Sequence, residues 1–304
     1  MLKIAIRADA SLLIGKGHIM RCLTLADEIQ THQGDAEITF LTTPHLGNLD
    51  QFILEQGFKV ISLSSPFDCL VKNNTATWLG RSQEEDAIAC QSALKQHYDI
   101  IIVDHYAIDI HWHQLMRKYC DKIMVIDDLA DRRHFCELLL DQTYARSAKD
   151  YLPYVTDTCQ LLLGTQYALL RPEFASWREY SLQRRVKPVF EKLLITMGGM
   201  DPDNVTGDIL AALELSVLPE ALMITVIMGL TAPHLESIKM QAQKMPVYTD
   251  VKVGVSNMAE LMANSDLAIG AAGGTTWERA AEGLPSITLC LAENQKQIAC
   301  ALQE

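Results

Sequence analysis

The sequence lacks the features that mark several classes of protein. No apolar run approaches the ~18 residues of a membrane-spanning helix. Lys3, Arg7 and Asp9 interrupt the first residues, where a signal peptide would carry an apolar core. The eight cysteines form no C-x-x-C pair, the usual mark of a zinc knuckle. We therefore expect a cytoplasmic protein without a zinc knuckle, whose cysteines are reduced thiols in the core.

Positive charge is also scarce. The sequence has 26 Lys and Arg residues against 38 Asp and Glu residues, and its formal net charge is −12. Binding along a nucleic acid needs cations that replace its counterions, so we expect no nucleic acid as a partner. The lack of a long apolar run predicts that no membrane is a partner either. The 304 residues predict roughly two domains. A content of 49% hydrophobic and 21% charged residues excludes a disordered chain or a coiled coil.

The first part of the chain alternates short apolar runs with amphipathic patterns. Strands are predicted at 3–8, 37–41, 59–63, 100–103 and 122–126, and helices at 19–30, 49–56, 84–96 and 112–119. Continuous apolar strands that alternate with helices predict a parallel sheet covered on both faces. Between Tyr144 and Pro188 the pattern weakens, and we interpret this stretch as the end of the first domain and a linker.

A second α/β pattern follows. Strands are predicted at 193–197, 222–228, 247–251, 267–269 and 286–291, with helices from 204 and at 235–244, 258–263, 275–282 and 295–302. The sequence therefore predicts an α/β protein with two Rossmann-like domains, 1–172 and 188–304. A cleft between the carboxyl ends of the two sets of strands is the expected ligand site.

The strongest local feature is a G-x-G-H sequence, residues 15–18, between the first strand and the first helix. Glycines there let the backbone turn tightly. His18 falls in the first turn of the helix, where the positive end of the helix dipole disfavours an imidazolium. A neutral imidazole at that position is available as a base near pH 7. The alternative is a surface turn that carries an incidental histidine.

Acidic residues follow several predicted strands of the first domain. Asp9, Asp104, Asp127 and Asp128 lie at carboxyl ends, and His105 follows Asp104. One of the carboxylates is expected to orient His18 through its second ring nitrogen. Oxygen ligands for a metal and caps for the following loops are the alternatives. Four further polar residues are expected to be solvated or to cap helices, namely Asp109, His111, His113 and His134.

The second domain carries two glycine loops, each between a strand and a helix. Gly199 belongs to the first, and Gly273, Gly274 and Thr275 to the second. Backbone N–H groups in such loops bind phosphate oxygens. Glu278, one turn into the following helix, is a candidate acceptor for a ribose diol. The alternative is a helix capped by Thr275 with an acidic first turn.

Together, these elements resemble the GT-B architecture of UDP-sugar enzymes. The chain most resembles the UDP-2,4-diacetamido-2,4,6-trideoxy-β-L-altropyranose hydrolase family of pseudaminic acid biosynthesis. The matching stretches follow in order along nearly the whole chain, at 7–9, 14–21, 103–106, 126–132, 169–174, 197–199 and 270–278. The G-G-T-x-x-E element alone is shared with MurG-like glycosyltransferases.

The resemblance implies hydrolysis of this small-molecule UDP-sugar with inversion, without metal or cofactor. It releases UDP and 2,4-diacetamido-2,4,6-trideoxy-L-altrose. We expect the protein to be a monomer. His18 matches the family's catalytic base, which deprotonates a water. Further matches imply a substrate contact at Arg171, a ribose contact at Glu278, and a position near the substrate for Asn294. Gly15 and Tyr106 are weaker pocket-lining candidates.

One departure and three alternatives accompany this resemblance. The chain ends at Glu304, soon after Glu278, whereas GT-B domains usually continue with another strand and helices. A second domain shortened at its C-terminal end is therefore an expectation. The alternatives are a MurG-like glycosyltransferase, a UDP-GlcNAc 2-epimerase that uses carboxylates of the first domain, and a nucleotide-sugar-binding protein without activity.

Overall fold

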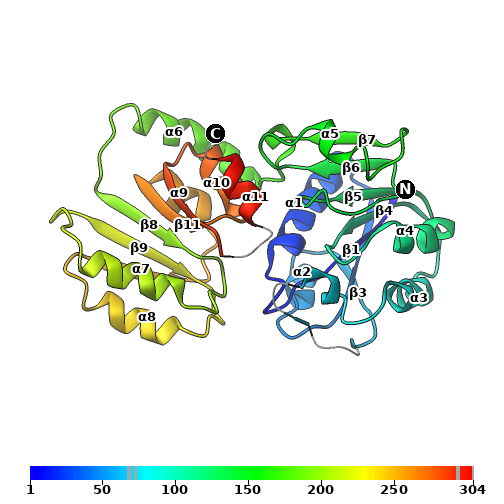
Figure 1. Cartoon of the computed structure of the whole chain (residues 1–304), viewed down its shortest axis with the longest axis horizontal. Coiled ribbons are helices and arrows are strands. Elements are labelled where there is room, and N and C mark those ends of the chain that lie inside the picture. The colour runs from blue at the N-terminus through cyan, green and yellow to red at the C-terminus, as the bar shows by residue number, and fades with distance from the viewer. Residues whose placement is uncertain (67–69, 72–73, 292–294, 303–304) are drawn as a thin grey trace. The chain divides into compact units, whose positions relative to one another are not determined.

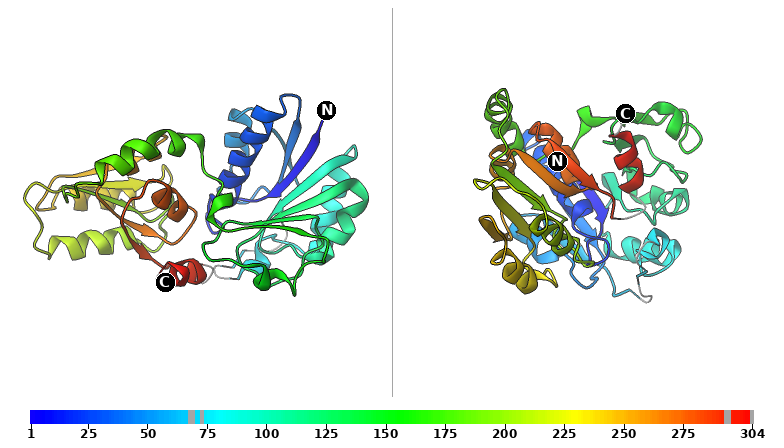
Figure 2. Two further views of the ribbon diagram at one scale, coloured as in Figure 1. Left: turned by 90° about the horizontal axis from the view of Figure 1, so that it is seen from above. Right: turned by 60° about the vertical axis from the view of Figure 1, so that its left-hand side comes forward.

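The computed structural model describes the chain except for residues 67–69, 72–73, 292–294 and 303–304. Two compact units are present, Met1–Leu169 and Leu170–Glu304. In each unit, helices flank a parallel sheet (Figures 1 and 2). The units are described separately below.

The first unit contains a seven-stranded sheet in the order β3-β2-β1-β4-β5-β6-β7. Its strands are β1 (Lys3–Ala8), β2 (Glu37–Thr42), β3 (Lys59–Ser62), β4 (Tyr98–Asp104), β5 (Cys120–Ile126), β6 (Leu138–Asp141) and β7 (Gln160–Leu163). Its helices are α1 (Gly17–His32), α2 (Asp50–Glu55), α3 (Gln83–Ala93), α4 (Ile110–Met116) and α5 (Ala148–Tyr151). Strand order reverses at β1 and β4, and parallel sheets bind ligands at such a switch point. The segments after β1 and β4 are therefore the natural place for a site.

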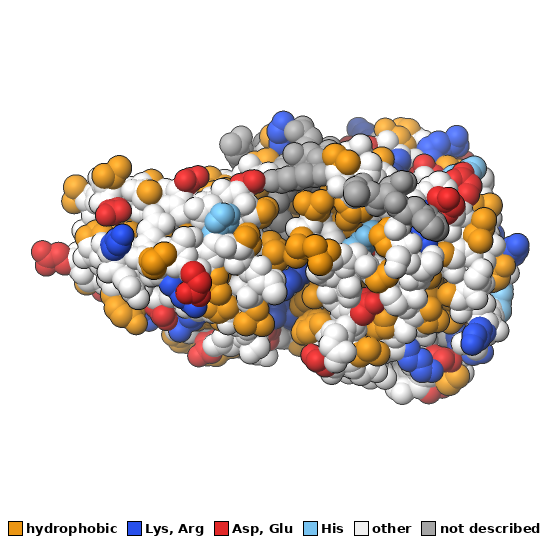
Figure 3. All heavy atoms as spheres, turned by 90° about the horizontal axis from the view of Figure 1, so that it is seen from below, with side chains coloured by type: hydrophobic (Ala, Val, Ile, Leu, Met, Phe, Trp, Pro, Cys, Tyr) orange, Lys and Arg blue, Asp and Glu red, His pale blue; other side chains and the backbone are white. Residues whose placement is uncertain are grey.

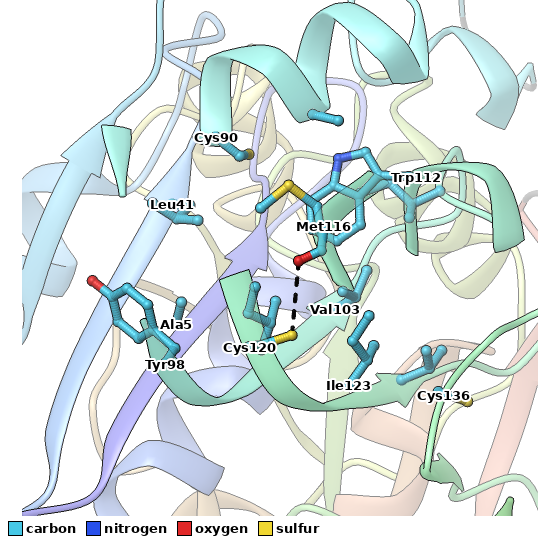
Figure 4. Packing of buried hydrophobic residues seen from close by; sticks show 14 of the residues in the cluster. Ala5, Leu41, Cys90, Tyr98, Val103, Trp112, Met116, Cys120, Ile123 and Cys136 are labelled. Atoms are coloured by element: carbon cyan, nitrogen blue, oxygen red, sulfur yellow. Dashed lines mark hydrogen bonds between the residues drawn. The ribbon is translucent and has the colours of Figure 1, made fainter. Parts of the chain in front are cut away.

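Two apolar clusters cover the two faces of this sheet. Along β1, Ala5 belongs to one cluster, and Ile4 and Ile6 belong to the other, as the alternation of side chains in a strand requires. Figure 4 shows the first cluster, in which Trp112 and Met116 of α4 pack with residues of β4 and β5. The sheet is thus buried on both faces, which explains its continuously apolar strands.

The second unit contains a five-stranded parallel sheet in the order β10-β9-β8-β11-β12. Its strands are β8 (Lys192–Thr196), β9 (Met223–Met228), β10 (Thr249–Val253), β11 (Leu267–Ala271) and β12 (Ser286–Leu289). Its helices are α6 (Pro172–Arg184), α7 (Val205–Glu214), α8 (Leu235–Ala242), α9 (Met258–Ala263), α10 (Thr275–Ala281) and α11 (Lys296–Ala301). The order reverses between β8 and β11, so both glycine loops follow strands at the switch point.

The stretch from 144 to 188 contains more regular structure than the linker that the sequence predicts. It contains α5, β7 and α6, and α6 belongs to the second unit, as does Arg171. Phe174 of α6 packs against Ala259 and Met262 of α9. Arg185 donates hydrogen bonds to the carbonyls of Met262 (3.0 Å) and Ser265 (2.9 Å). Arg185, which the sequence analysis places in a linker, therefore donates hydrogen bonds to carbonyls at the end of α9.

The surface carries charges of both signs. On the face shown in Figure 3, Lys and Arg side chains are interspersed with Asp and Glu side chains. Among the described residues, no helix is both long enough and apolar enough to span a bilayer.

Candidate functional site

A tight loop leads from β1 into α1 and places His18. The backbone N–H of Gly15 donates to the Ser11 carbonyl at 2.9 Å, and Gly15 has a φ of +82°. That positive φ explains why glycine stands there. The helix begins at Gly17 without a side-chain cap. His18 is therefore in the first turn, as the sequence predicts, and its side chain is only 7% exposed.

Asp104, the last residue of β4, orients His18. Its Oδ1 lies 2.6 Å from His18 Nδ1, which leaves Nε2 as the ring nitrogen for a reaction partner. Arg21 donates to both oxygens of the same carboxylate, each at 2.6 Å. Burial opposes ionisation of Asp104, but Arg21 and His18 outweigh it and hold the pKa of that carboxyl far below its usual range. The carboxylate partner that the sequence leaves open is thus Asp104.

Two aromatic side chains pack beside the imidazole. The ring of Tyr106 meets His18 edge-on, with centroids 4.6 Å apart, and Trp78 lies 5.6 Å from Tyr106. Burial and the nearby Asp128 carboxylate raise the pKa of Tyr106 well above its usual value, so its hydroxyl stays protonated. The sequence analysis did not predict Trp78 as a site residue, because no motif connects it with His18 or Tyr106.

A fully buried charge cluster lies at the switch point as well. Arg7 of β1 donates to both oxygens of Asp86 (3.1 and 2.7 Å) and to Asp9 (2.7 Å). The other oxygen of Asp9 lies 3.3 Å from His105 Nε2 and 3.7 Å from His45 Nε2. Asp9 also accepts the backbone N–H of Thr43 at 2.6 Å. These contacts give Asp9 a structural role and leave the orientation of His18 to Asp104.

Asp127 also has a structural role. Its Oδ2 accepts the Tyr151 hydroxyl (2.8 Å) and the backbone N–H of Ala130 (2.9 Å). Asp109 caps α4 by accepting the His111 N–H at 2.8 Å, as the sequence predicts, and His111 is exposed. Asp127 thus holds the loop that follows β5, and Asp109 caps a helix.

The expectation of solvated side chains at His113 and His134 is wrong. Both are buried, and their rings stack with centroids 5.5 Å apart. His113 Nδ1 accepts the backbone N–H of Phe135 at 3.2 Å. Burial lowers the pKa of His113 well below its usual value and that of His134 to about 4. The pair is therefore neutral in the folded protein.

This neutral pair predicts acid-sensitive stability. Below pH 6.5 the unfolded chain binds protons on both histidines, whereas the folded chain does not. Stability is thus fully present above that pH and falls as the pH drops toward 4. Between pH 7 and pH 5 each histidine should remove about 2 kcal/mol from the free energy of unfolding. In His134→Phe only His113 contributes. Urea unfolding at pH 7 and pH 5 should therefore show about half of the loss that the two histidines cause together.

The matched control is His97→Phe, because His97 is half exposed beside Asp121. Its loss of stability between pH 7 and pH 5 should equal that of the natural sequence. If His134→Phe also keeps the full loss, the buried pair is not its source.

In the second unit, the first glycine loop is largely closed on itself. Asp201 accepts the backbone N–H groups of Val205 (2.9 Å) and Thr206 (2.8 Å) at the start of α7. The Gly199 carbonyl accepts the Gly229 N–H at 3.1 Å, where a side chain on Gly229 would collide with it. A carboxylate thus already occupies the start of α7, so the second loop is the better candidate for a phosphate.

The second loop has no side-chain cap. Gly274, not Thr275, is the N-cap of α10, and no side chain accepts a hydrogen bond there. Arg279 lies buried beneath the loop and donates to the Ala271 carbonyl (3.1 Å) and the Thr275 hydroxyl (3.2 Å). A Cβ on Gly270 would come within 2.4 Å of its Nη1, which explains that glycine. The capping alternative for Thr275 is therefore wrong.

Arg171 and Glu278, 107 residues apart in sequence, meet in this unit. Arg171 Nη2 lies 3.4 Å from Glu278 Oε1, and Nη1 lies 2.8 Å from Glu173. Burial raises the pKa of Glu278 despite the opposing effect of Arg171. The structure thus brings two of the predicted substrate-binding residues together. Asn294, a third, lies outside the described residues.

The sequence is similar to those of several known proteins. No model of a protein family matches the sequence. The chain is 27% identical over 302 residues to the UDP-2,4-diacetamido-2,4,6-trideoxy-β-L-altropyranose hydrolase of Campylobacter jejuni, with 98% of this chain and 95% of that one covered. An uncharacterised protein of Methanocaldococcus jannaschii is also 27% identical, over 97% of this chain, but this chain spans only 57% of its length. The spore coat polysaccharide biosynthesis protein SpsG of Bacillus subtilis is 29% identical over 143 residues, which are 47% of this chain and 41% of SpsG.

Solved structures show the same architecture. MurG of Acinetobacter baumannii superposes with a TM-score of 0.63 at 16% identity, over the whole of this chain and 84% of MurG. The UDP-GlcNAc 2-epimerase of Neisseria meningitidis gives a TM-score of 0.58 at 13% identity, over 99% of this chain and 85% of that one. At such identities the likeness concerns the fold alone. It confirms the predicted α/β fold of GT-B type.

Proposed function

We propose that the chain hydrolyses UDP-2,4-diacetamido-2,4,6-trideoxy-β-L-altropyranose to UDP and 2,4-diacetamido-2,4,6-trideoxy-L-altrose. Similarity to the Campylobacter jejuni hydrolase over nearly the full length of both chains supports this substrate. The observation that carries the proposal is the 2.6 Å contact between His18 and Asp104. A carboxylate that holds Nδ1 leaves Nε2 to act as a base.

In the proposed reaction, His18 Nε2 takes a proton from a water molecule. The water oxygen forms a bond to the anomeric carbon on the face opposite UDP. The bond from that carbon to the phosphate oxygen breaks, and its electron pair leaves with UDP, so the configuration inverts. Asp104 stabilises the imidazolium that forms. UDP is a good leaving group, and a strong general acid is therefore less needed.

The second unit is proposed to bind the UDP moiety. The backbone N–H groups of Gly273, Gly274 and Thr275 donate to the diphosphate and absorb its developing charge. Glu278 accepts hydrogen bonds from the ribose diol, and Arg171 contacts the substrate while it holds Glu278 in place. The start of α10, which has no side-chain cap, supports this assignment.

Three of the remaining predicted residues keep auxiliary roles in the proposal. Tyr106 and Gly15 line the site beside His18. The ring contact of Tyr106 with His18 and the place of Gly15 in the loop before α1 support this. Gly199 adds a backbone contact to the diphosphate.

The direct test is an NMR time course of the purified protein with this UDP-sugar, in EDTA and without an acceptor. Release of UDP together with the free altrose derivative supports the hydrolase. Turnover that needs an added acceptor would instead identify a MurG-like transferase. A new UDP-sugar as product would identify an epimerase, and tight UDP binding without any turnover would identify a binding protein.

The ribose contact gives a separate prediction. Glu278→Ala should weaken UDP binding about tenfold, or about 1.4 kcal/mol, because a charged acceptor loses its hydrogen bonds to the diol. The same variant should bind 2′-deoxy-UDP nearly as well as UDP, whereas the natural sequence should prefer UDP. Isothermal titration calorimetry measures all four affinities.

The control for this prediction is Glu236→Ala, which removes an exposed acid of α8 from the same unit. It should leave both affinities unchanged. If Glu278→Ala weakens UDP and 2′-deoxy-UDP by the same factor, Glu278 does not read the 2′-hydroxyl.

A further inference from the structure

We infer that Arg21 is a positioning residue of the proposed base, holding Asp104 and, through it, the imidazole of His18. The inference rests on the proposed function and extends it to a residue that contacts neither water nor sugar in the reaction. His18 and Arg21 are three residues apart on α1, so their side chains lie next to each other on one face of the helix.

Each nitrogen of the Arg21 guanidinium donates a hydrogen bond to a carboxylate. Its Nε and Nη2 donate to the two oxygens of Asp104 at 2.6 Å each, in the planar fork geometry that arginine favours with a carboxylate. Its Nη1 donates to Asp128 at 2.9 Å. All three nitrogens are thus used, and the side chain is only 11% exposed. A group held in this way cannot turn without releasing Asp104.

The fork fixes where Asp104 presents its oxygen to the imidazole. Oδ1 of Asp104 contacts both Arg21 Nη2 and His18 Nδ1, each at 2.6 Å. Rotation of the carboxylate would break the bond to Arg21 and move the imidazole together with it. Arg21 therefore restricts the His18 ring to one orientation, which a base acting on a single water requires.

Arg21 also brings a positive charge close to the imidazole. Its Nη2 lies 3.4 Å from His18 Nδ1, so a permanent positive charge faces the ring. The other ionisable groups around the imidazole are Asp104 from β4, His105 next to it, and Tyr106. The charges of Asp104 and Arg21 have opposite signs, so removal of Arg21 alone changes the charge that faces the ring.

The test compares Arg21→Met with Arg21→Lys. Arg21→Met removes both the charge and the fork, so the acidic limb of the pH profile of kcat/KM should move up by roughly one unit. Its kcat at pH 7 should fall about 10²-fold. Arg21→Lys keeps the charge and loses the fork, so the limb should stay in place while kcat falls about tenfold. UDP affinity should change less than twofold in both.

Arg117→Met provides the matched control. Arg117 also grips a carboxylate, that of Glu137, through two nitrogens. This variant should leave the pH profile unchanged. A profile of Arg21→Met that superposes on that of the natural sequence, with only a lower melting temperature, would overturn the inference.

A second readout separates this inference from the proposed function. The C2 proton of His18 can be followed by NMR across pH in the absence of substrate, assigned by its disappearance in His18→Gln. The inference requires its titration midpoint to rise in Arg21→Met but not in Arg21→Lys, and an unchanged midpoint in Arg21→Met overturns it. An absence of turnover with the UDP-sugar would count against the proposed function alone.

Discussion

Replacement of His18 by glutamine or alanine is expected to lower kcat by about 10²–10⁴-fold, the usual contribution of a positioned base. Neither side chain can accept a proton from water at neutral pH. UDP affinity should change less than twofold, because the residues proposed to bind UDP all belong to the second unit. Rates of UDP release and calorimetric UDP titrations measure the two quantities in the same preparations.

The control for His18 is His111→Gln, since His111 is an exposed histidine of the same unit. It should leave both kcat and UDP affinity unchanged. Loss of UDP binding in His18→Gln would mean that His18 has a structural role. Full activity in that variant would mean that another group activates the water.

The largest effect on stability is expected from Arg7→Met. The guanidinium is the countercharge for Asp9 and Asp86, and all three side chains are fully buried. Removing one partner of a buried ion pair leaves uncompensated charge, which typically costs 3–5 kcal/mol. Two carboxylates would be left here, so about 4 kcal/mol or more should be lost from the free energy of unfolding. Urea denaturation at pH 7 measures that loss.

Two further variants make this test specific. Lys59→Met removes the exposed partner of Glu37 and should leave the urea midpoint almost unchanged. Arg7→Met combined with Asp86→Asn should recover part of the stability, because one of the two unpaired carboxylates is gone. The explanation fails if Arg7→Met shifts the midpoint no more than Lys59→Met does.

Much of the fold could be predicted from local patterns. The strands of both switch points and the helices that follow them have the apolar runs and periodicity that the sequence analysis used. β6 and β7 are not among the predicted strands, and β7 falls within the stretch that the sequence analysis interprets as a linker. α6 was missed because the partners of its basic residues lie far away in sequence: Arg178 donates to the carbonyl of Ala281 and Arg184 to that of Ser265.

The candidate site divides in the same way. Gly15, His18 and the two glycine loops stand at the ends of strands, where periodicity and turn chemistry are informative. The partner of His18 required the structure, because Asp104 lies 86 residues away and competes with three other aspartates in equivalent positions. The burial of His113 and His134 also depends on tertiary packing, which spacing along the chain does not record.

The position of β1 has a consequence for folding during synthesis. β1 is made before the other strands of its sheet, yet it lies between β2 and β4, so its second neighbour is complete only when Asp104 has been made. At ~5–20 residues per second, β1 waits roughly 5–20 s for that neighbour. During this interval one edge of an apolar strand is unpaired and open to wrong partners. The loop with His18 is therefore made early, but it acquires Asp104 only when 86 further residues have been added.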